Sequence, residues 1–395
     1  MMNLKAIYLK HSFFWIYNLV FLLLIFGDVY VFGIKHLNQL VFYFASFVMV
    51  YFLMNKFTLK WMLPELKFNQ KLMVKFLIVI GLGIVASHLL SLGGSPAIES
   101  LDLMKISEVN MKRKSIGTNS HFIWKYLSSM NIKAILPFLL LILLIEKNKM
   151  YWVVFFIGCF YCFSLMQKSH ILSFLIPVLL YTLFKKNWLY ALKYGITIGV
   201  VIIGLVFVSS PSLRGGMNDL RKTELKSQKS NDSKIVSIAK SLTKRIFIMP
   251  GEMVGNWFEI IPQKKPFLKG KGYNAFCKIT KQKYHDYNLE LYPVIFPDYA
   301  NQGIKGSVNS AHFMRGYSNF GNLGLFLSAI MLALMLSVLN IVFQSSNQTM
   351  KLCINLFPIF LLSSGSLSTI LFSGGWGLLI LLFWIFKNDL TTNHE

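Results

Sequence analysis

Hydrophobic residues occur along this chain in long continuous runs rather than in alternation with polar residues. A helical run of about 20 apolar residues matches the hydrocarbon thickness of a bilayer, whereas a membrane β-barrel requires alternation. The runs predict about ten spanning helices, near residues 12–33, 38–54, 72–91, 122–146, 150–167, 169–185, 189–210, 318–342, 352–371 and 374–387. Serines and glycines interrupt the last two runs, so a re-entrant segment is an alternative to two spanning helices there.

Composition agrees with a membrane protein. The 395 residues are 55% hydrophobic, with a mean hydropathy of +0.54, which is more apolar surface than a soluble chain of this size can bury. Lys5 and Lys10 precede the first apolar run. This run is not the short core of a cleavable signal peptide followed by a small-residue cleavage site, so we expect an uncleaved first helix. Cys159 and Cys162 fit best as small apolar residues of a helix, with a redox C-x-x-C as the alternative.

Lysines in the short loops predict the orientation, because such loops carry most positive charge on the cytoplasmic side. With both termini cytoplasmic, the short inner segments hold the lysines at positions 5, 10, 56, 60, 67, 71, 147, 149, 185, 186, 351 and 387. The expected fold is an all-α polytopic membrane protein with a first bundle of about seven helices at 1–210, a large periplasmic loop at 211–316 and C-terminal helices at 317–395. Within the loop, residues 223–240 are expected to be mobile or to form an amphipathic helix.

The charge is strongly positive, at +24 for the whole chain. Because it lies between membrane helices, it favours anionic lipid, lipid-linked phosphate or acidic sugar over nucleic acid as the partner. The sequence also predicts a shorter outer loop at 93–121, within the first bundle. Arginine, whose planar fork grips phosphate or carboxylate, occurs only in this loop and in the large loop at 211–316, at Arg113, Arg214, Arg221, Arg245 and Arg315. No Walker, D-x-D or zinc motif is present, so no cofactor or metal is expected.

The segment Asn309–Gly324 reads NSAHFMRGYSNFGNLG. It resembles the Wzy-type O-antigen polymerases, in which N-x-A-x-F-x-x-x-Y-x-N-F-G-x-x-G leads from the large outer loop into the next helix. Residues 245–250 (RIFIMP), 257–259 (WFE) and 266–270 (PFLKG) are also similar, as is the turn at Lys168. The resemblance implies a GT-C-like bundle at the bacterial inner membrane. It also implies an enzyme that polymerises undecaprenyl-diphosphate-linked repeat units into O-antigen or capsular-type polysaccharide. A chain-length regulator is a further partner.

Such a transfer needs cations to stabilise the departing diphosphate and a base for the acceptor hydroxyl. The catalytic candidates are His312, Arg315, Arg245 and Glu252, with Glu259 and Asp298 as alternative carboxylates. The substrate-binding candidates are Lys168, Arg214, Asn309, Tyr317 and Asn319.

Three of these candidates carry a local structural expectation. His312 and Arg315 share a face if their segment is helical. Asn319 is expected either to cap the following helix or to bind sugar hydroxyls.

Three other functions remain open at this point. An O-antigen ligase shares the topology and the lipid-linked donor. A flippase or transporter for lipid-linked sugars is expected to show repeated halves and short loops. A membrane scaffold has no need for arginines on one face.

Overall fold

The computed structural model describes residues 11–58, 64, 69–118, 122–214, 243–301, 306–344 and 348–392. Within these ranges the secondary structure is helical, and no β-strand occurs among the residues described. The expectation of an all-α fold is therefore confirmed. Arg221 and residues 223–240 lie outside the described residues.

Among the residues that the structure describes, six helical stretches are long and apolar enough to cross a bilayer. They contain α2 (Ser12–Phe32), α3 (Leu37–Thr58), α4 (Gln70–Ser91), α7–η2–α8 (Phe122–Met130, Asn131–Ile135 and Leu136–Ile145), α11 (Trp188–Ser209) and α18 (Met314–Val342). Four shorter apolar helices accompany them: α9 (Met150–Ser164), α10 (Lys168–Phe184), α19 (Gln348–Leu361) and α21 (Trp376–Thr392). Large apolar side chains on these helices are exposed, such as Leu19 at 64% and Val79 at 70%, as expected for helices that face lipid. The protein is membrane-embedded.

The C-terminal expectation of one helix over 352–371 is wrong. Helix α19 ends at Leu361, and the short helix α20 (Leu367–Leu371) follows after a turn. The hydroxyls of Ser363 and Ser364 donate back to the carbonyls of Phe360 and Leu361. Serine side chains that bond locally to the backbone compete with the helical ladder, which explains the break.

The helices group into two compact units that alternate along the chain. Among the described residues, the first unit holds 11–58, 64, 243–301, 306–344 and 358–370, and the second holds 69–118, 122–214, 348–357 and 371–392. The first unit therefore contains α2, α3, α18, η5 (Lys244–Ile248), α13 (Met249–Ile260), α14 (Asn274–Thr280), α15 (Tyr287–Glu290), α16 (Tyr292–Ile295) and α17 (Pro297–Asn301). The second contains α4, α5 (Pro96–Glu99), η1 (Ser100–Asp102), α6 (Ile106–Thr118), α7–α11 and η3 (Pro211–Arg214).

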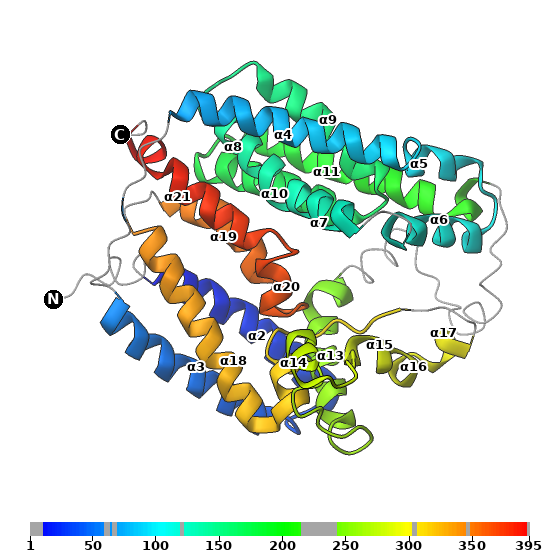
Figure 1. The fold of residues 1–395 in the computed structure, drawn as a ribbon, viewed down its shortest axis with the longest axis vertical. Coiled ribbons are helices and arrows are strands. Elements are labelled where there is room, and N and C mark those ends of the chain that lie inside the picture. Colours follow the sequence, from blue (N-terminus) through cyan, green and yellow to red (C-terminus); the bar gives the residue numbers. More distant parts are fainter. Residues whose placement is uncertain are drawn as a thin grey trace. The chain divides into compact units, whose positions relative to one another are not determined.

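In the first unit, α3 and α18 lie side by side over much of their length (Figure 1). Hydrogen bonds between polar side chains join α3 and α18 within their otherwise apolar interface. Asn55 donates to Ser337 (3.3 Å), and Asn340 donates to both Tyr51 (2.9 Å) and Asn55 (2.9 Å). Interhelical hydrogen bonds of this kind hold helices together where both faces are apolar.

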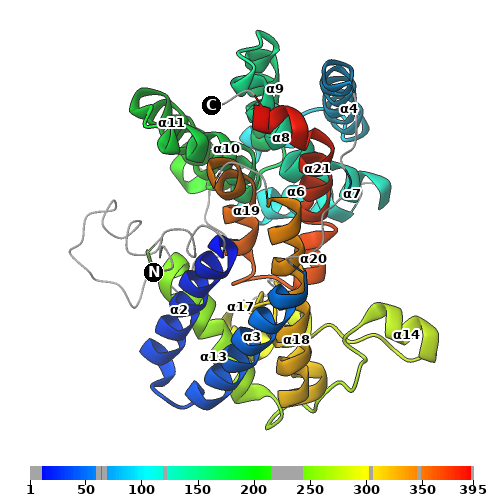
Figure 2. The same cartoon turned by 90° about the vertical axis from the view of Figure 1, so that its left-hand side faces the viewer.

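Helix α13 crosses α2 at very short distance (Figure 1 and Figure 2). A Cβ atom added at Gly27, Gly251 or Gly255 meets atoms of the opposite helix, most of them backbone, at less than van der Waals separation. Glycines spaced by four residues allow such close backbone approach. The crossing places α13 beside Asp28, which is fully buried.

In the second unit, α10 packs against α8, α9 and α11 (Figure 1). The stretch α7–α8 contains a π-helical turn, η2, at Asn131–Ile135. Asn131 donates from Nδ2 to the Gly81 carbonyl of α4 (2.9 Å), and Gly375 lies against Ala134. A π-helical turn inside an α-helix is uncommon and often marks a functional site.

Candidate functional site

Helix α18 begins at Met314, four residues before the start expected from the sequence, and it bends sharply at Gly321. Gly321 has φ +59° and ψ −136°, a conformation that essentially only glycine adopts. The bend folds the first turn back, so that Gly316 lies directly against Gly324 and leaves no room for a Cβ at either position. Gly321 therefore forms the bend, and Gly324 forms the close contact with Gly316.

Side chains of the first turn of α18 hold a preceding loop in place. The Tyr317 hydroxyl donates to the carbonyl of Ile261 (3.1 Å). The Asn319 side chain accepts from the Gly272 amide (2.9 Å) and donates to the Arg315 carbonyl (2.7 Å). Tyr317 is 6% exposed and Asn319 is 0% exposed. The expectation that Asn319 caps the helix is wrong, and both side chains are turned inward onto protein atoms.

Arg315 projects from this first turn into a polar group of side chains. Its Nε and Nη2 donate to the Gly272 carbonyl (3.2 and 2.8 Å), and Nη1 faces the hydroxyls of Ser366 (3.5 Å) and Ser368 (3.4 Å). The guanidinium also lies over the Tyr273 ring, 5.1 Å from its centre. No carboxylate of the described residues forms an ion pair with it. We call these residues the Arg315 cluster.

Tyr284 is a further aromatic residue close to the Arg315 charge. Burial is the main cause that raises the pKa of both Tyr273 and Tyr284, and the charge of Arg315 acts in the opposite direction. Asp286 adds to the rise at Tyr284. Both phenols therefore stay protonated near neutral pH and are available as hydrogen-bond donors.

His312 is more deeply buried than the half-buried Arg315. It precedes α18, is 5% exposed, and has both ring nitrogens engaged: Nε2 with the Tyr43 hydroxyl (2.9 Å) and Nδ1 with the Leu362 carbonyl (3.3 Å). The carbonyl can only accept, so Nδ1 carries the proton and Nε2 accepts from Tyr43, which is bonded in turn to Tyr17 (2.8 Å). Burial lowers the pKa of His312 to about 4. The geometry fits a neutral structural histidine rather than a catalytic base.

The other first-unit candidates form no hydrogen bond or ion pair with Arg315 among the described residues. Arg245 is exposed on η5, and Asn309 is exposed before α18. Glu252 lies on α13, where its Oε2 is 3.8 Å from Lys244 Nζ and is buried without a hydrogen-bond partner.

Glu259, an alternative carboxylate, belongs to a network that the sequence did not reveal. His36 is 3% exposed and bonds Asp28 through Nδ1 and Glu259 through Nε2, both at 3.0 Å, and Lys35 pairs with Glu259 at 2.5 Å. Burial alone lowers the pKa of His36, but the bonds and charges of Asp28 and Glu259 outweigh it and raise the pKa overall. The hydrogen bond from Lys35 lowers the pKa of Glu259. The network fastens the α2–α3 turn to α13.

In the second unit, Arg214 is turned inward. Its guanidinium donates to three backbone carbonyls: those of Leu101, Leu103 (3.1 Å) and Val208 (3.1 Å). Its Nε is buried without a partner. Arg214 thus ties the segment after η1 to the end of α11, which is a structural role and not the substrate contact expected. Lys168 is the exposed first residue of α10.

The second unit also holds ionisable residues inside apolar helices that the sequence reading missed. His170 of α10 is 7% exposed, and its Nδ1 has no hydrogen-bond partner. Lys133 on η2, Arg113 on α6 and His88 on α4 lie near enough to influence its charge. Ionisable residues within membrane helices commonly mark functional sites. In the sequence, these residues could have been found as a lysine (Lys133) and two histidines (His88 and His170) inside otherwise apolar runs.

Comparisons with models of protein families, with characterised proteins and with solved structures gave no match to this chain. Within the described ranges, no group of three or more His, Cys, Asp or Glu side chains is placed to hold a metal ion.

Proposed function

We propose that this protein is a membrane glycosyltransferase that polymerises oligosaccharide repeat units carried on undecaprenyl diphosphate. In this proposal about ten helices cross the bacterial inner membrane with both termini in the cytoplasm, and the region from 211 to 316 faces the periplasm. The product is an O-antigen or capsular-type polysaccharide. The resemblance of residues 309–324 to the Wzy-type polymerases supports the proposal, as does the membrane-embedded helical fold.

The observation that carries the proposal is the Arg315 cluster. A half-buried guanidinium without a carboxylate partner in the described part of the chain is suited to an anionic ligand. The hydroxyls of Ser366 and Ser368 supply neutral donors beside it. Cations and preorganised donors stabilise the charge that develops on a departing diphosphate.

The reaction joins two lipid-linked glycans. A hydroxyl of the acceptor unit attacks the anomeric carbon of the donor glycan, the bond from that carbon to the diphosphate oxygen breaks, and undecaprenyl diphosphate leaves with the electron pair. A base removes the hydroxyl proton. Since His312 is enclosed by Tyr43 and Leu362, Glu252 and Asp298 remain as the carboxylates expected from the sequence that are not held in the His36 network.

Deletion of the gene in its host tests the proposal. Loss of a polymerase is expected to leave single repeat units on the lipid core, which a polysaccharide gel resolves as one short band. Loss of a ligase or a flippase leaves bare core instead. Restoration of the long chains by the wild-type gene is the control. Bare core after deletion contradicts polymerisation, and a reporter fused within 211–316 that reads as cytoplasmic contradicts the proposed topology.

A further inference from the structure

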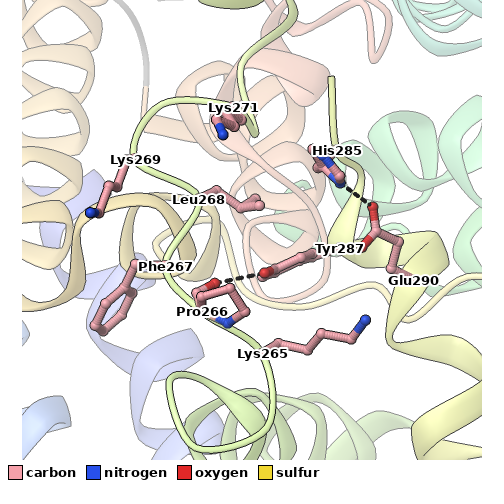
Figure 3. A pocket seen from close by; sticks show the side chains of 9 residues that line it. All are labelled: Lys265, Pro266, Phe267, Leu268, Lys269, Lys271, His285, Tyr287 and Glu290. Atoms are coloured by element: carbon pink, nitrogen blue, oxygen red, sulfur yellow. Dashed lines mark hydrogen bonds and ion pairs between the residues drawn. The ribbon is translucent and has the colours of Figure 1, made fainter. Parts of the chain in front are cut away.

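A pocket of about 300 Å³ opens in the first unit beside the Arg315 cluster. Its lining includes Lys265, Leu268, Lys271, His285, Tyr287 and Glu290 (Figure 3). Lys271 is followed directly by Gly272 and Tyr273, which contact Arg315. The volume lies at the lower end of the range of about 300–1,000 Å³ for small-molecule sites, which suits a sugar.

Hydrogen bonds to other parts of the first unit hold the chain segments that form the wall of this pocket. The amides of Leu268 and Lys269 donate to the carbonyls of Ser318 and Asn319 in α18, both at 2.9 Å. On the other side, the Tyr287 hydroxyl donates to the Pro266 carbonyl (2.6 Å; Figure 3). A further bond joins the His285 amide to the Lys271 carbonyl (3.0 Å). A cavity held in this way is preorganised, which lowers the entropic cost of binding.

The charges in the pocket favour an anion. Lys265 and Lys271 form no ion pair with any acidic residue of the described ranges. The carboxylate of Glu290 is bonded to His285 Nδ1 at 2.9 Å (Figure 3). In this view Lys269, also part of the lining, extends away from His285 and Glu290. The two lysines therefore leave an excess of positive charge, while the Glu290–His285 pair offers hydrogen bonds to hydroxyl groups.

We propose that this pocket binds an anionic sugar of the glycan substrate, with Lys265 and Lys271, on opposite sides of the pocket (Figure 3), supplying the positive charge that attracts its carboxylate or phosphate group. Tyr287 and Leu268 contact the apolar face of the ring, and Glu290 accepts from ring hydroxyls. The inference rests on the proposed function for the identity of the ligand as part of a repeat unit. It adds that the repeat unit carries a negative charge of its own, separate from the lipid diphosphate.

Binding to the full-length protein in lipid nanodiscs tests the inference without any polymerisation. The probes are methyl glucuronide for the carboxylate, glucose 6-phosphate for the phosphate, and methyl glucoside as the neutral counterpart, each followed by saturation-transfer NMR. At least one anionic probe is expected to bind about tenfold more tightly than methyl glucoside, because a charge-assisted hydrogen bond is lost in the neutral sugar. Which anion binds identifies the group that the substrate carries.

Matched variants decide whether the two lysines are responsible. Lys265→Gln and Lys271→Gln are each expected to weaken the anionic probe about tenfold. Lys264→Gln makes the same charge change at an exposed neighbour that does not line the pocket, and it is expected to leave binding unchanged. Thermal unfolding of each variant confirms that it is folded.

Two results overturn the inference: equal binding of the neutral and anionic sugars, or equal effects of Lys264→Gln and Lys265→Gln. Either result leaves the proposed polymerase intact, because it concerns only the pocket. Conversely, bare core after gene deletion removes the polymerase and leaves the measured sugar preference standing.

Discussion

Arg315 gives the most direct test of the proposed chemistry, through Arg315→Gln and Arg315→Lys. Replacement by Gln removes two hydrogen bonds to the buried Gly272 carbonyl. Leaving that carbonyl unsatisfied costs about 1–3 kcal/mol, which is tolerable within a usual total stability of about 5–15 kcal/mol. The loss of a preorganised cation from the leaving group is expected to slow polymerisation about 10²–10³-fold. The variant should therefore remain mostly folded while long chains disappear.

Arg315→Lys separates charge from geometry. Lysine keeps the positive charge, but it lacks the planar fork that reaches the Gly272 carbonyl and the hydroxyls of Ser366 and Ser368 together. Its rate is expected to fall between those of the wild type and Arg315→Gln. The assay is polymer formation by membrane vesicles, divided by the amount of folded protein from fluorescence-detected size exclusion.

A second arginine serves as the control for this experiment. Arg214 also donates to backbone carbonyls, but it has no place in the proposed chemistry. Arg214→Gln is expected to lower the amount of folded protein, with the rate per folded molecule within about threefold of wild type. A rate within the same margin for Arg315→Gln would refute the assignment of Arg315 to the leaving group.

Two further predictions concern stability. The raised pKa of His36 means that its bonds to Asp28 and Glu259 stabilise the fold fully below its ordinary value of 6.5 and are lost as the pH rises through the raised value. The lowered pKa of Glu259 means that its contribution is present above 4.5 and is lost as the pH falls through the lowered value. As the pH is raised from 6.5 through the raised pKa of His36, the wild type should therefore lose more thermal stability than His36→Gln. Parallel profiles would contradict this. Gly321→Ala is expected to destabilise the protein by about 1–3 kcal/mol because of its positive φ, whereas Gly199→Ala, in open space on α11, should be neutral or stabilising in the same unfolding assay.

The sequence predicted the helices well where the apolar runs were uninterrupted. Helices α2, α4 and α11 begin and end within about two residues of their expected positions, since hydrophobicity alone determines where a chain can cross a bilayer. It failed where local chemistry competes with the helix, as at Ser363, and where the next helix starts inside a polar motif, as at Met314. Apolar periodicity carries no information on such boundaries.

The candidate site was predictable in residue type but not in role. Spacing placed His312 with Arg315, yet the partner that encloses His312 is Tyr43, 269 residues away. Arg214 was expected at the substrate because arginines gather in the outer segments, but Leu101 and Leu103 occupy its guanidinium. Long-range contacts of this kind decide whether a polar side chain faces protein or ligand, and a single sequence does not contain them.

The polar contact between α3 and α18 has a consequence for how the protein is made. Thr58 ends α3 and Met314 begins α18, so about 250 residues must be translated in between, which takes roughly 10–50 s at 5–20 residues per second. During that interval Asn55 lacks its partners Ser337 and Asn340 while its helix is already inserted. Until α18 is made, the Asn55 amide nitrogen has only the Tyr51 carbonyl of its own helix as a partner (2.9 Å), and its side-chain oxygen lacks the Asn340 donor, a state in which an insertase or chaperone that shelters polar groups would raise the yield of mature protein.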